Sequence, residues 1–121
     1  MLRLIQCGIP SMACLNGSAI ANGFLIAMCH DFRIMKAGKG VIGLPENPMG
    51  TELPIAYNEL CVRKLSSSAY LKMMYGKFLK PKEAIEDGVV QDLYADLDEL
   101  QLKIHRFAAK FSKFGGNQAL N

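Results

Sequence analysis

The sequence predicts an α/β fold of short strands and helices packed in layers, and three observations lead to this prediction. First, short apolar runs such as residues 11–15 alternate along the chain with helical patterns such as residues 55–65. Second, residues 23–29 are apolar on every side, so a helix there needs layers around it. Third, 121 residues with 50% hydrophobic and 21% charged side chains can bury one core but not two ordinary ones.

The first third of the chain is predicted to hold two helical segments and three short strands. Helices are expected over residues 1–7 and 23–29, and strands over residues 11–15, 31–36 and 41–42. Gly8 and Pro10 stop the first helix, because proline has no amide proton to donate. The pair Asn16-Gly17 supplies the positive φ angles of a tight turn after the first strand, which we expect to be buried. The alternating side chains of residues 32–35 indicate another strand.

The next segment, residues 44–54, is predicted to be a loop with a restricted backbone, because it contains three prolines, one glycine and a threonine. Helices follow over residues 55–65 and 69–75. The three serines before the second helix are typical of a helix start, and Gly76 is typical of a helix end. Pro81 begins a further short helix that Gly88 ends, and an extended segment comes after it.

The last helix is predicted from Asp96 and Glu99, which together resemble a capping box. An apolar stripe at helical spacing follows: Leu97, Leu100, Ile104, Phe107, Ala108 and Phe111. Gly115-Gly116 is expected to end this helix. Its basic side chains are interpreted as a solvated face, with an anion-contacting surface as the alternative: Lys103, Arg106, Lys110 and Lys113.

Composition and spacing argue against several classes of function. The formal charge of +3 comes without an aromatic-interleaved basic run, so nucleic-acid binding is not expected. His30 and His105 are far apart and no C-x-x-C pair occurs, so no metal site is expected. The longest apolar run, residues 19–29, is too short for a membrane span. Four cysteines in apolar surroundings are expected to be buried free thiols in a reducing compartment: Cys7, Cys14, Cys29 and Cys61.

Three ordered segments carry a family resemblance. Residues 9–34 are IPSMACLNGSAIANGFLIAMCHDFRI, residues 43–50 are GLPENPMG, and residues 75–90 are YGKFLKPKEAIEDGVV. In this order and at this separation they resemble the crotonase (enoyl-CoA hydratase/isomerase) superfamily over almost the whole chain. The resemblance implies a partial spiral α/β fold of the ClpP/crotonase type, in which residues 1–121 form a single domain without the family's N-terminal strands and C-terminal helices.

The resemblance also implies a biochemical setting. The substrate would be an acyl-CoA, with coenzyme A as part of the substrate and no separate cofactor. The chain would work as a homo-oligomer, with a complementary chain, or in a larger complex, because a chain without half of the family's layers exposes apolar surface. Relatives of this kind imply a mitochondrial or peroxisomal location.

The resemblance assigns chemistry to two positions. Glu46 matches the family carboxylate in the loop that lines the acyl pocket, where Leu44, Pro45 and Met49 would shield it from water and make it a stronger base. A solvated loop glutamate is the alternative interpretation. Asn22 matches the position whose backbone N–H helps to hold the thioester oxygen, because an amide at a helix start has no intrahelical partner.

The residues around Asn22 bear on which activity the chain resembles. Many relatives have a run of glycines where Ala21 and Gly23 flank Asn22, and these residues could instead serve close packing at a helix start. Family hydratases carry a second glutamate at the position of Leu25 to activate water, whereas isomerisation needs only one shuttling base. Leu25 and Glu46 together therefore resemble Δ3,Δ2-enoyl-CoA isomerases, which shift a double bond in an acyl-CoA during fatty-acid β-oxidation. The alternatives are a hydratase and a non-catalytic subunit of a larger assembly. The expected substrate-binding residues are Ala21, Gly23, Leu25, Pro45 and Met49.

Overall fold

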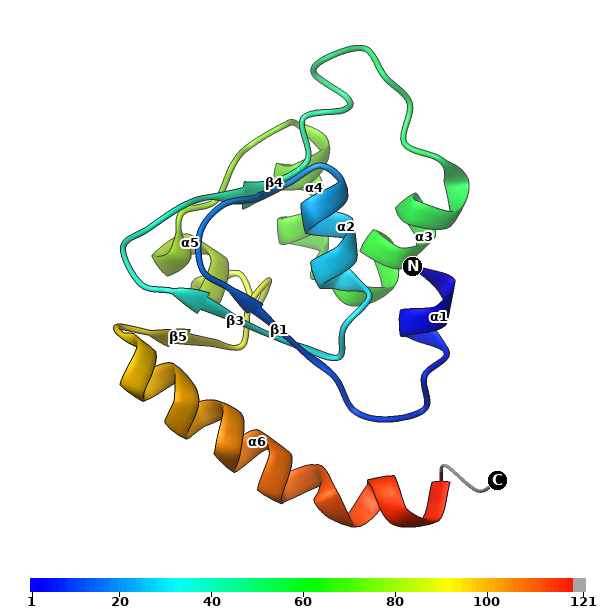
Figure 1. The fold of residues 1–121 in the computed structure, drawn as a ribbon. Helices are drawn as coiled ribbons and strands as arrows, with labels where there is room; N and C mark the ends of the chain where they lie inside the picture. Colours follow the sequence, from blue (N-terminus) through cyan, green and yellow to red (C-terminus); the bar gives the residue numbers. More distant parts are fainter. Residues whose placement is uncertain (119–121) are drawn as a thin grey trace.

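The computed structural model describes the backbone of residues 1–118 and the side chains of residues 1–113. Its strands are β1 (Met12–Leu15), β2 (Ala19–Ile20), β3 (Phe32–Lys36), β4 (Ile42–Gly43) and β5 (Asp92–Tyr94). Its helices are α1 (Leu2–Ile5), α2 (Asn22–Met28), α3 (Ile55–Lys64), α4 (Ser67–Met74), α5 (Pro81–Glu86) and α6 (Leu97–Gln118). The expected α/β alternation is therefore confirmed (Figure 1).

Two small parallel sheets form the centre of the fold. β1, β3 and β5 lie side by side in that order, and Ala13 of β1 stands opposite Arg33 of β3. β2 pairs with β4, where Ala19 stands opposite Ile42. Parallel neighbours need a crossover connection. Here α2 lies in the crossover from β1 to β3, and α3, α4 and α5 lie in the crossover from β3 to β5.

Helices cover both faces of the larger sheet (Figure 1). On one face, α2 buries Phe24 and Met28 completely in the main hydrophobic core. On the other face, α6 brings Phe107 and Phe111 against Phe32 of β3, with ring centroids 5.3 and 5.6 Å from that of Phe32. The predicted apolar stripe of α6 thus packs through its two phenylalanines, whereas Leu97 at the start of the helix stays 70% exposed.

The local signals at the starts of α4 and α6 are confirmed. The Ser66 hydroxyl accepts a hydrogen bond from the Ala69 amide at 3.2 Å and caps α4. Asp96 caps α6 by accepting from the Glu99 amide at 2.8 Å. The Glu99 carboxylate reaches back to the amide of Ala95 at 2.7 Å, one residue before the amide that a standard capping box uses.

One predicted boundary is wrong and one strand was missed. α6 does not end at Gly115-Gly116 but runs to Gln118. A glycine in a helix costs about 1 kcal/mol relative to alanine, which disfavours a helix there without forbidding it. The prediction also missed β2, because two residues between a turn and a helix are too few to show a strand's alternation.

Several burial predictions also need correction. Helix α2 is not buried on every side, since Ile26 is 44% exposed. Cys29 and Cys61 are buried free thiols as expected, but Cys7 and Cys14 are exposed. Cys7 lies in the turn after α1, and Cys14 lies on β1, which is an edge strand of its sheet and has a neighbour on one side only.

No helix within residues 1–118 combines the length and apolar character that crossing a membrane requires. Among the same residues, no three side chains of His, Cys, Asp or Glu gather where a metal ion could bind.

Candidate active site

The start of α2 has an unusual backbone. Ala21, the N-cap residue, has φ 54° and ψ −121°, and no other non-glycine residue in the described part of the chain has a positive φ. Such a conformation costs of order 1–3 kcal/mol and persists only where its surroundings hold it in place. Here the Ala21 amide donates to the Gly43 carbonyl at 3.1 Å, which extends the pairing of β2 with β4 by one residue.

The first backbone amides of α2 have no acceptor within the helix. Leu25 is the first residue of the segment whose amide reaches back into it, donating to the Ala21 carbonyl at 3.0 Å. The amides of Asn22 and Gly23 precede it and have no intrahelical acceptor, and no side chain caps this end. Both residues are exposed. The sequence-predicted position thus presents a free backbone N–H at a helix start, where the helix dipole favours negative charge.

The loop that carries Glu46 begins where β4 ends. Leu44 is buried at 2% exposure, and Pro45 and Glu46 are half-buried. The loop closes on itself as a turn, because the Thr51 amide donates to the Glu46 carbonyl at 2.9 Å and the Met49 amide donates to the Pro45 carbonyl at 3.1 Å. The prolines therefore mark a compact turn rather than an extended connection.

The Glu46 side chain points inward. Its Oε2 atom is buried, and no described residue donates a hydrogen bond to it. Buried carboxylate oxygens without a donor are rare in folded proteins because desolvation costs free energy that no partner returns. A buried acceptor of this kind is a candidate to receive a proton from a substrate.

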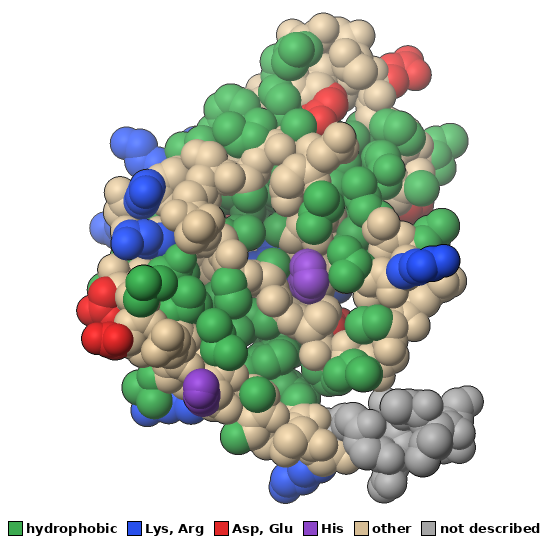
Figure 2. All heavy atoms as spheres, viewed as in Figure 1, with side chains coloured by type: hydrophobic (Ala, Val, Ile, Leu, Met, Phe, Trp, Pro, Cys, Tyr) green, Lys and Arg blue, Asp and Glu red, His purple; other side chains and the backbone are tan. Residues whose placement is uncertain are grey.

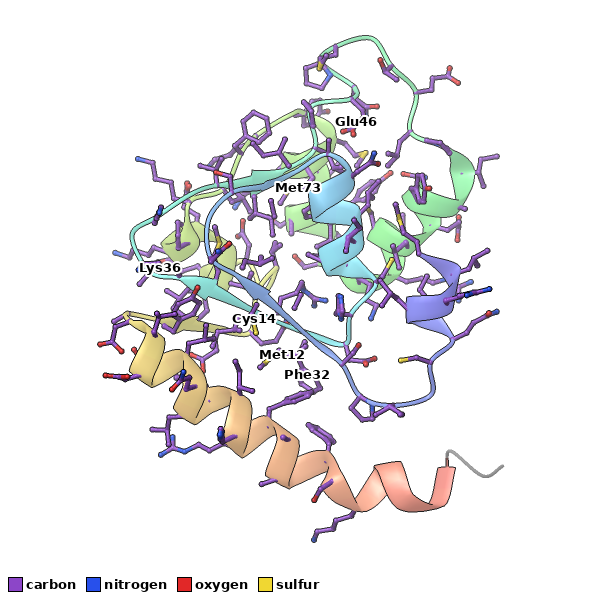
Figure 3. All side chains as sticks on the ribbon, viewed as in Figure 1. Met12, Cys14, Phe32, Lys36, Glu46 and Met73 are labelled. Carbon is purple, nitrogen blue, oxygen red and sulfur yellow. The ribbon has the colours of Figure 1, made fainter. Side chains whose placement is uncertain are left out.

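The surroundings of Glu46 are mostly apolar. The space beside it is too narrow to hold a water molecule and is lined also by Leu44, Asn47, Leu53, Met73 and Met74. Figure 3 shows Glu46 above the N-terminal end of α2, with Met73 in the core below it. Met49, which the sequence suggested as a residue shielding Glu46 from water, is 73% exposed, so this expectation is wrong. The cover comes instead from residues of α4 and from Leu53.

Cys61 of α3 lies close enough to Glu46 for the charge of the carboxylate to act on its thiol. This thiol is fully buried. Burial, followed by the negative charge of Glu46, raises the pKa of Cys61 to about 11. The charge of Glu46 therefore acts on the protein interior and not only on solvent.

The two predicted chemical groups lie at neighbouring points of the fold. Asn22 directly follows Ala21, Glu46 lies three residues after Gly43, and the Ala21–Gly43 hydrogen bond joins the two segments. The narrow space beside Glu46 is not lined by Asn22, Ala21 or Gly23. Leu25 faces the core at 1% exposure. Sequence reasoning missed Asn47, Met73 and Met74, and only the position of Asn47 next to Glu46 could have suggested one of them.

Comparisons with known proteins identify the family of this chain. The family model described as "Enoyl-CoA hydratase/isomerase" matches residues 1–118. "Enoyl-CoA delta isomerase 3" from Arabidopsis thaliana is 33% identical over 101 residues, which cover 82% of this chain and 42% of that protein. "Enoyl-CoA delta isomerase 1, mitochondrial" from Mus musculus is 29% identical, over 91% of this chain and 38% of that protein.

Solved structures give the same result for the fold. An enoyl-CoA hydratase/isomerase family protein from Pseudomonas syringae superposes with a TM-score of 0.83 at 28% identity, covering 92% of this chain and 48% of that one. An enoyl-CoA hydratase/carnitine racemase from Magnetospirillum magneticum superposes with a TM-score of 0.80 at 22% identity, covering 90% and 40%. The chain thus spans less than half the length of these relatives.

Proposed function

Because this chain belongs to the enoyl-CoA hydratase/isomerase family, we propose that it carries the base of an enoyl-CoA isomerase that moves a double bond from C3 to C2 of an acyl-CoA. The observation that carries the proposal is the buried Oε2 of Glu46, which no described residue supplies with a hydrogen bond. The names of the relatives as enoyl-CoA delta isomerases support the same reaction. The mitochondrial mouse relative, a peroxisomal enoyl-CoA delta isomerase 2 from Arabidopsis thaliana and a fatty acid oxidation complex subunit alpha from Shewanella baltica support by their names a place in fatty-acid oxidation, in a peroxisome or mitochondrion.

The proposed reaction needs one base and one stabilised oxygen. Glu46 takes a proton from C2 of a 3-enoyl thioester, and the electron pair of that C–H bond moves into a dienolate whose negative charge lies on the thioester oxygen. The Asn22 N–H donates to this oxygen. Glu46 then returns the proton to C4, which leaves the double bond between C2 and C3. No atom is gained or lost, so coenzyme A enters only as part of the substrate and no separate cofactor is required.

Leu25 favours isomerisation over hydration. Adding water across a double bond needs a second group to position and activate the water. By the family resemblance that group would stand at Leu25, which is an apolar side chain buried at 1% exposure. A hydratase is therefore the weaker candidate for this chain.

Exposed apolar side chains favour a second candidate, a non-catalytic subunit held in an assembly. Figure 2 shows hydrophobic side chains spread over the face in view. Several large ones are well exposed: Leu2 at 72%, Ile5 at 52%, Ile9 at 46% and Ile26 at 44%. Further copies, a complementary chain or a larger complex would cover such surface. The same partner could complete the active site, so this observation is compatible with both candidates.

The test compares two glutamates of one loop in the assembly isolated with this chain. We expect Glu46→Gln to lower the rate of 3-enoyl-CoA to 2-enoyl-CoA conversion by about 100-fold or more, since general bases contribute about 10²–10⁴-fold. Glu52→Gln, which alters an exposed carboxylate, should leave the rate unchanged. Full activity of Glu46→Gln would place the base elsewhere. Water addition to 2-enoyl-CoA that depends on Glu46 would favour the hydratase. No activity in any isolated assembly would favour the structural subunit.

A further inference from the structure

We propose that Asn47 and Gly76 are positioning residues, which fasten the loop of Glu46 to the C-terminal end of α4 and so set the direction of the Glu46 carboxylate. The inference deepens the proposed function and rests on it for its catalytic consequence. Its structural content, that the two residues hold the loop, can be tested without any activity.

At the C-terminal end of α4, the carbonyl of Met74 accepts its hydrogen bond from the side chain of Asn47. Gly76 has φ 78°, its amide donates to the Met73 carbonyl at 2.9 Å, and the Lys77 amide donates to the Lys72 carbonyl at 2.9 Å. These two bonds form a Schellman motif, which satisfies two of the last helical carbonyls. The next carbonyl, that of Met74, accepts from Nδ2 of Asn47 at 3.2 Å. A side chain of the Glu46 loop therefore completes the cap of a helix that lies 27 residues further along the chain.

Gly76 makes the second attachment through Pro48. A Cβ atom at Gly76 would lie 2.1 Å from Cγ and 3.1 Å from Cδ of Pro48, far inside van der Waals contact. The proline ring thus rests directly on the backbone of Gly76. The two residues that follow Glu46, Asn47 and Pro48, are each fixed to the end of α4, one by a hydrogen bond and one by close packing.

These attachments matter because the Glu46 side chain has little else to orient it. No described residue donates to its buried Oε2. Its direction must therefore come from the backbone of the loop and from the packing of its neighbours. Proton transfer needs the base within hydrogen-bond distance of C2, and a small displacement of a reacting group lowers the rate strongly. A loosened loop would let the carboxylate turn toward water.

The structural test uses two glycines with the same backbone strain. Gly88 has φ 71° and no atom within 4 Å of a Cβ built on it, so Gly88→Ala introduces the left-handed strain alone. Gly76→Ala introduces the same strain and also displaces Pro48. We expect amide hydrogen exchange at Met49, Gly50 and Thr51, measured by NMR on the full chain, to become about fivefold faster or more in Gly76→Ala than in Gly88→Ala, which corresponds to losing about one hydrogen bond's net stabilisation.

A second pair of variants covers the case in which Gly76→Ala does not fold. Asn47→Leu keeps the approximate side-chain size and removes the donor to the Met74 carbonyl. Asn58→Leu is the matched control, because it removes an amide oxygen that accepts from the Tyr70 hydroxyl at 2.8 Å and leaves the bond from Asn47 to Met74 in place. Exchange at Met49, Gly50 and Thr51 should rise in Asn47→Leu only. Equal exchange in both members of either pair would overturn the inference.

The effect of the loop attachment on catalysis is measured in a separate experiment. In an assembly that isomerises 3-enoyl-CoA, Asn47→Leu should lower kcat while KM stays nearly constant, and Asn58→Leu should change neither. Faster loop exchange with an unaltered kcat would overturn the positioning role. If the wild-type assembly never isomerises 3-enoyl-CoA, the proposed function fails. In that case, faster exchange in Gly76→Ala and Asn47→Leu would still support the attachment of the loop.

Discussion

Nε of Arg33 donates a 2.7 Å hydrogen bond to the carbonyl of Val89, 56 residues later in the chain. Arg33 is only 4% exposed, and one of its terminal nitrogens also donates to the His30 carbonyl at 2.8 Å. Burial lowers the pKa of the guanidinium, and the charge of Asp31 partly offsets this effect. Arg33 therefore joins the turn before β3 to the segment that enters β5.

Replacing Arg33 should make the folded protein much less stable. We expect Arg33→Met to lower the free energy of unfolding by about 2–4 kcal/mol, because the buried Val89 carbonyl would lose its charged donor and the part-buried His30 carbonyl would keep only the one from Lys64. Arg63→Met is the control, since Arg63 is exposed and its pair with Glu59 is long at 3.9 Å. A surface change of this kind should stay within about 0.5 kcal/mol. Urea denaturation of both variants measures the difference, and equal losses would show that the Arg33 bonds contribute little.

The strain at Ala21 predicts an unusual response to glycine. We expect Ala21→Gly to leave the free energy of unfolding unchanged or to raise it by up to about 1 kcal/mol, because glycine relieves the positive φ but loses more entropy on folding. The same change at Ala69, a fully buried helical residue, should cost at least about 1 kcal/mol. Ala21→Val should cost about 1–3 kcal/mol, since a β-branched residue tolerates this conformation poorly. If Ala21→Gly proves as destabilising as Ala69→Gly, Ala21 is not strained.

Cys61 predicts a loss of stability in alkali. In the unfolded chain a thiol ionises near pH 9.0, whereas burial followed by the charge of Glu46 raises the folded pKa of Cys61 to about 11. Below pH 9 the thiol is protonated in both states and has no effect. As the pH rises from 9 to 11, only the unfolded state releases the proton, so stability falls by up to about 1.4 kcal/mol per pH unit.

Two alanine variants isolate this contribution. Cys61→Ala removes the titrating group and leaves a cavity, so its deficit relative to the wild type should be constant below pH 9 and shrink above it. Cys7→Ala removes an exposed thiol and should follow the wild-type curve throughout. A deficit of Cys61→Ala that stays constant to pH 11 would contradict the raised pKa.

The contrast between Ser66 and Ala21 shows what the sequence could predict. Ser66 caps α4 through a bond to Ala69, three residues away, and such local chemistry is visible in a short window of sequence. The three prolines of residues 44–54 likewise predict a loop. The positive φ of Ala21 has no such signal, because alanine does not favour it, and it depends on pairing with Gly43 in a strand that comes later.

In the candidate site, too, the sequence could predict some features and not others. Glu46 and Asn22 could be proposed as site residues from ordered segments, and the family that these segments resemble is confirmed by the match to residues 1–118. What surrounds Glu46 could not be read from its neighbours in sequence: Met49, three residues away, is exposed, and Met73, 27 residues away, lines the narrow space beside Glu46. Contacts between a loop and a distant helix follow from packing, for which a single sequence gives no local pattern.

Leu25 allows a last prediction, about the alternative activity. By the family resemblance, a hydratase would carry a glutamate at this position, but Leu25 lies in the core at 1% exposure. A glutamate there would bring a second carboxylate into an apolar region close to α3 and α4. We expect Leu25→Glu to lower the free energy of unfolding by about 3 kcal/mol or more and to produce no hydration of 2-enoyl-CoA.

Leu25→Met provides the control for this position, because it conserves volume and should cost less than about 1.5 kcal/mol. Denaturation and a 2-enoyl-CoA hydration assay on the isolated assembly measure both variants. The opposite result, a stable Leu25→Glu variant that adds water, would mean that the carboxylate finds solvent beside Glu46. The site would then be open enough for hydration, and the single side chain at position 25 would decide between the two activities.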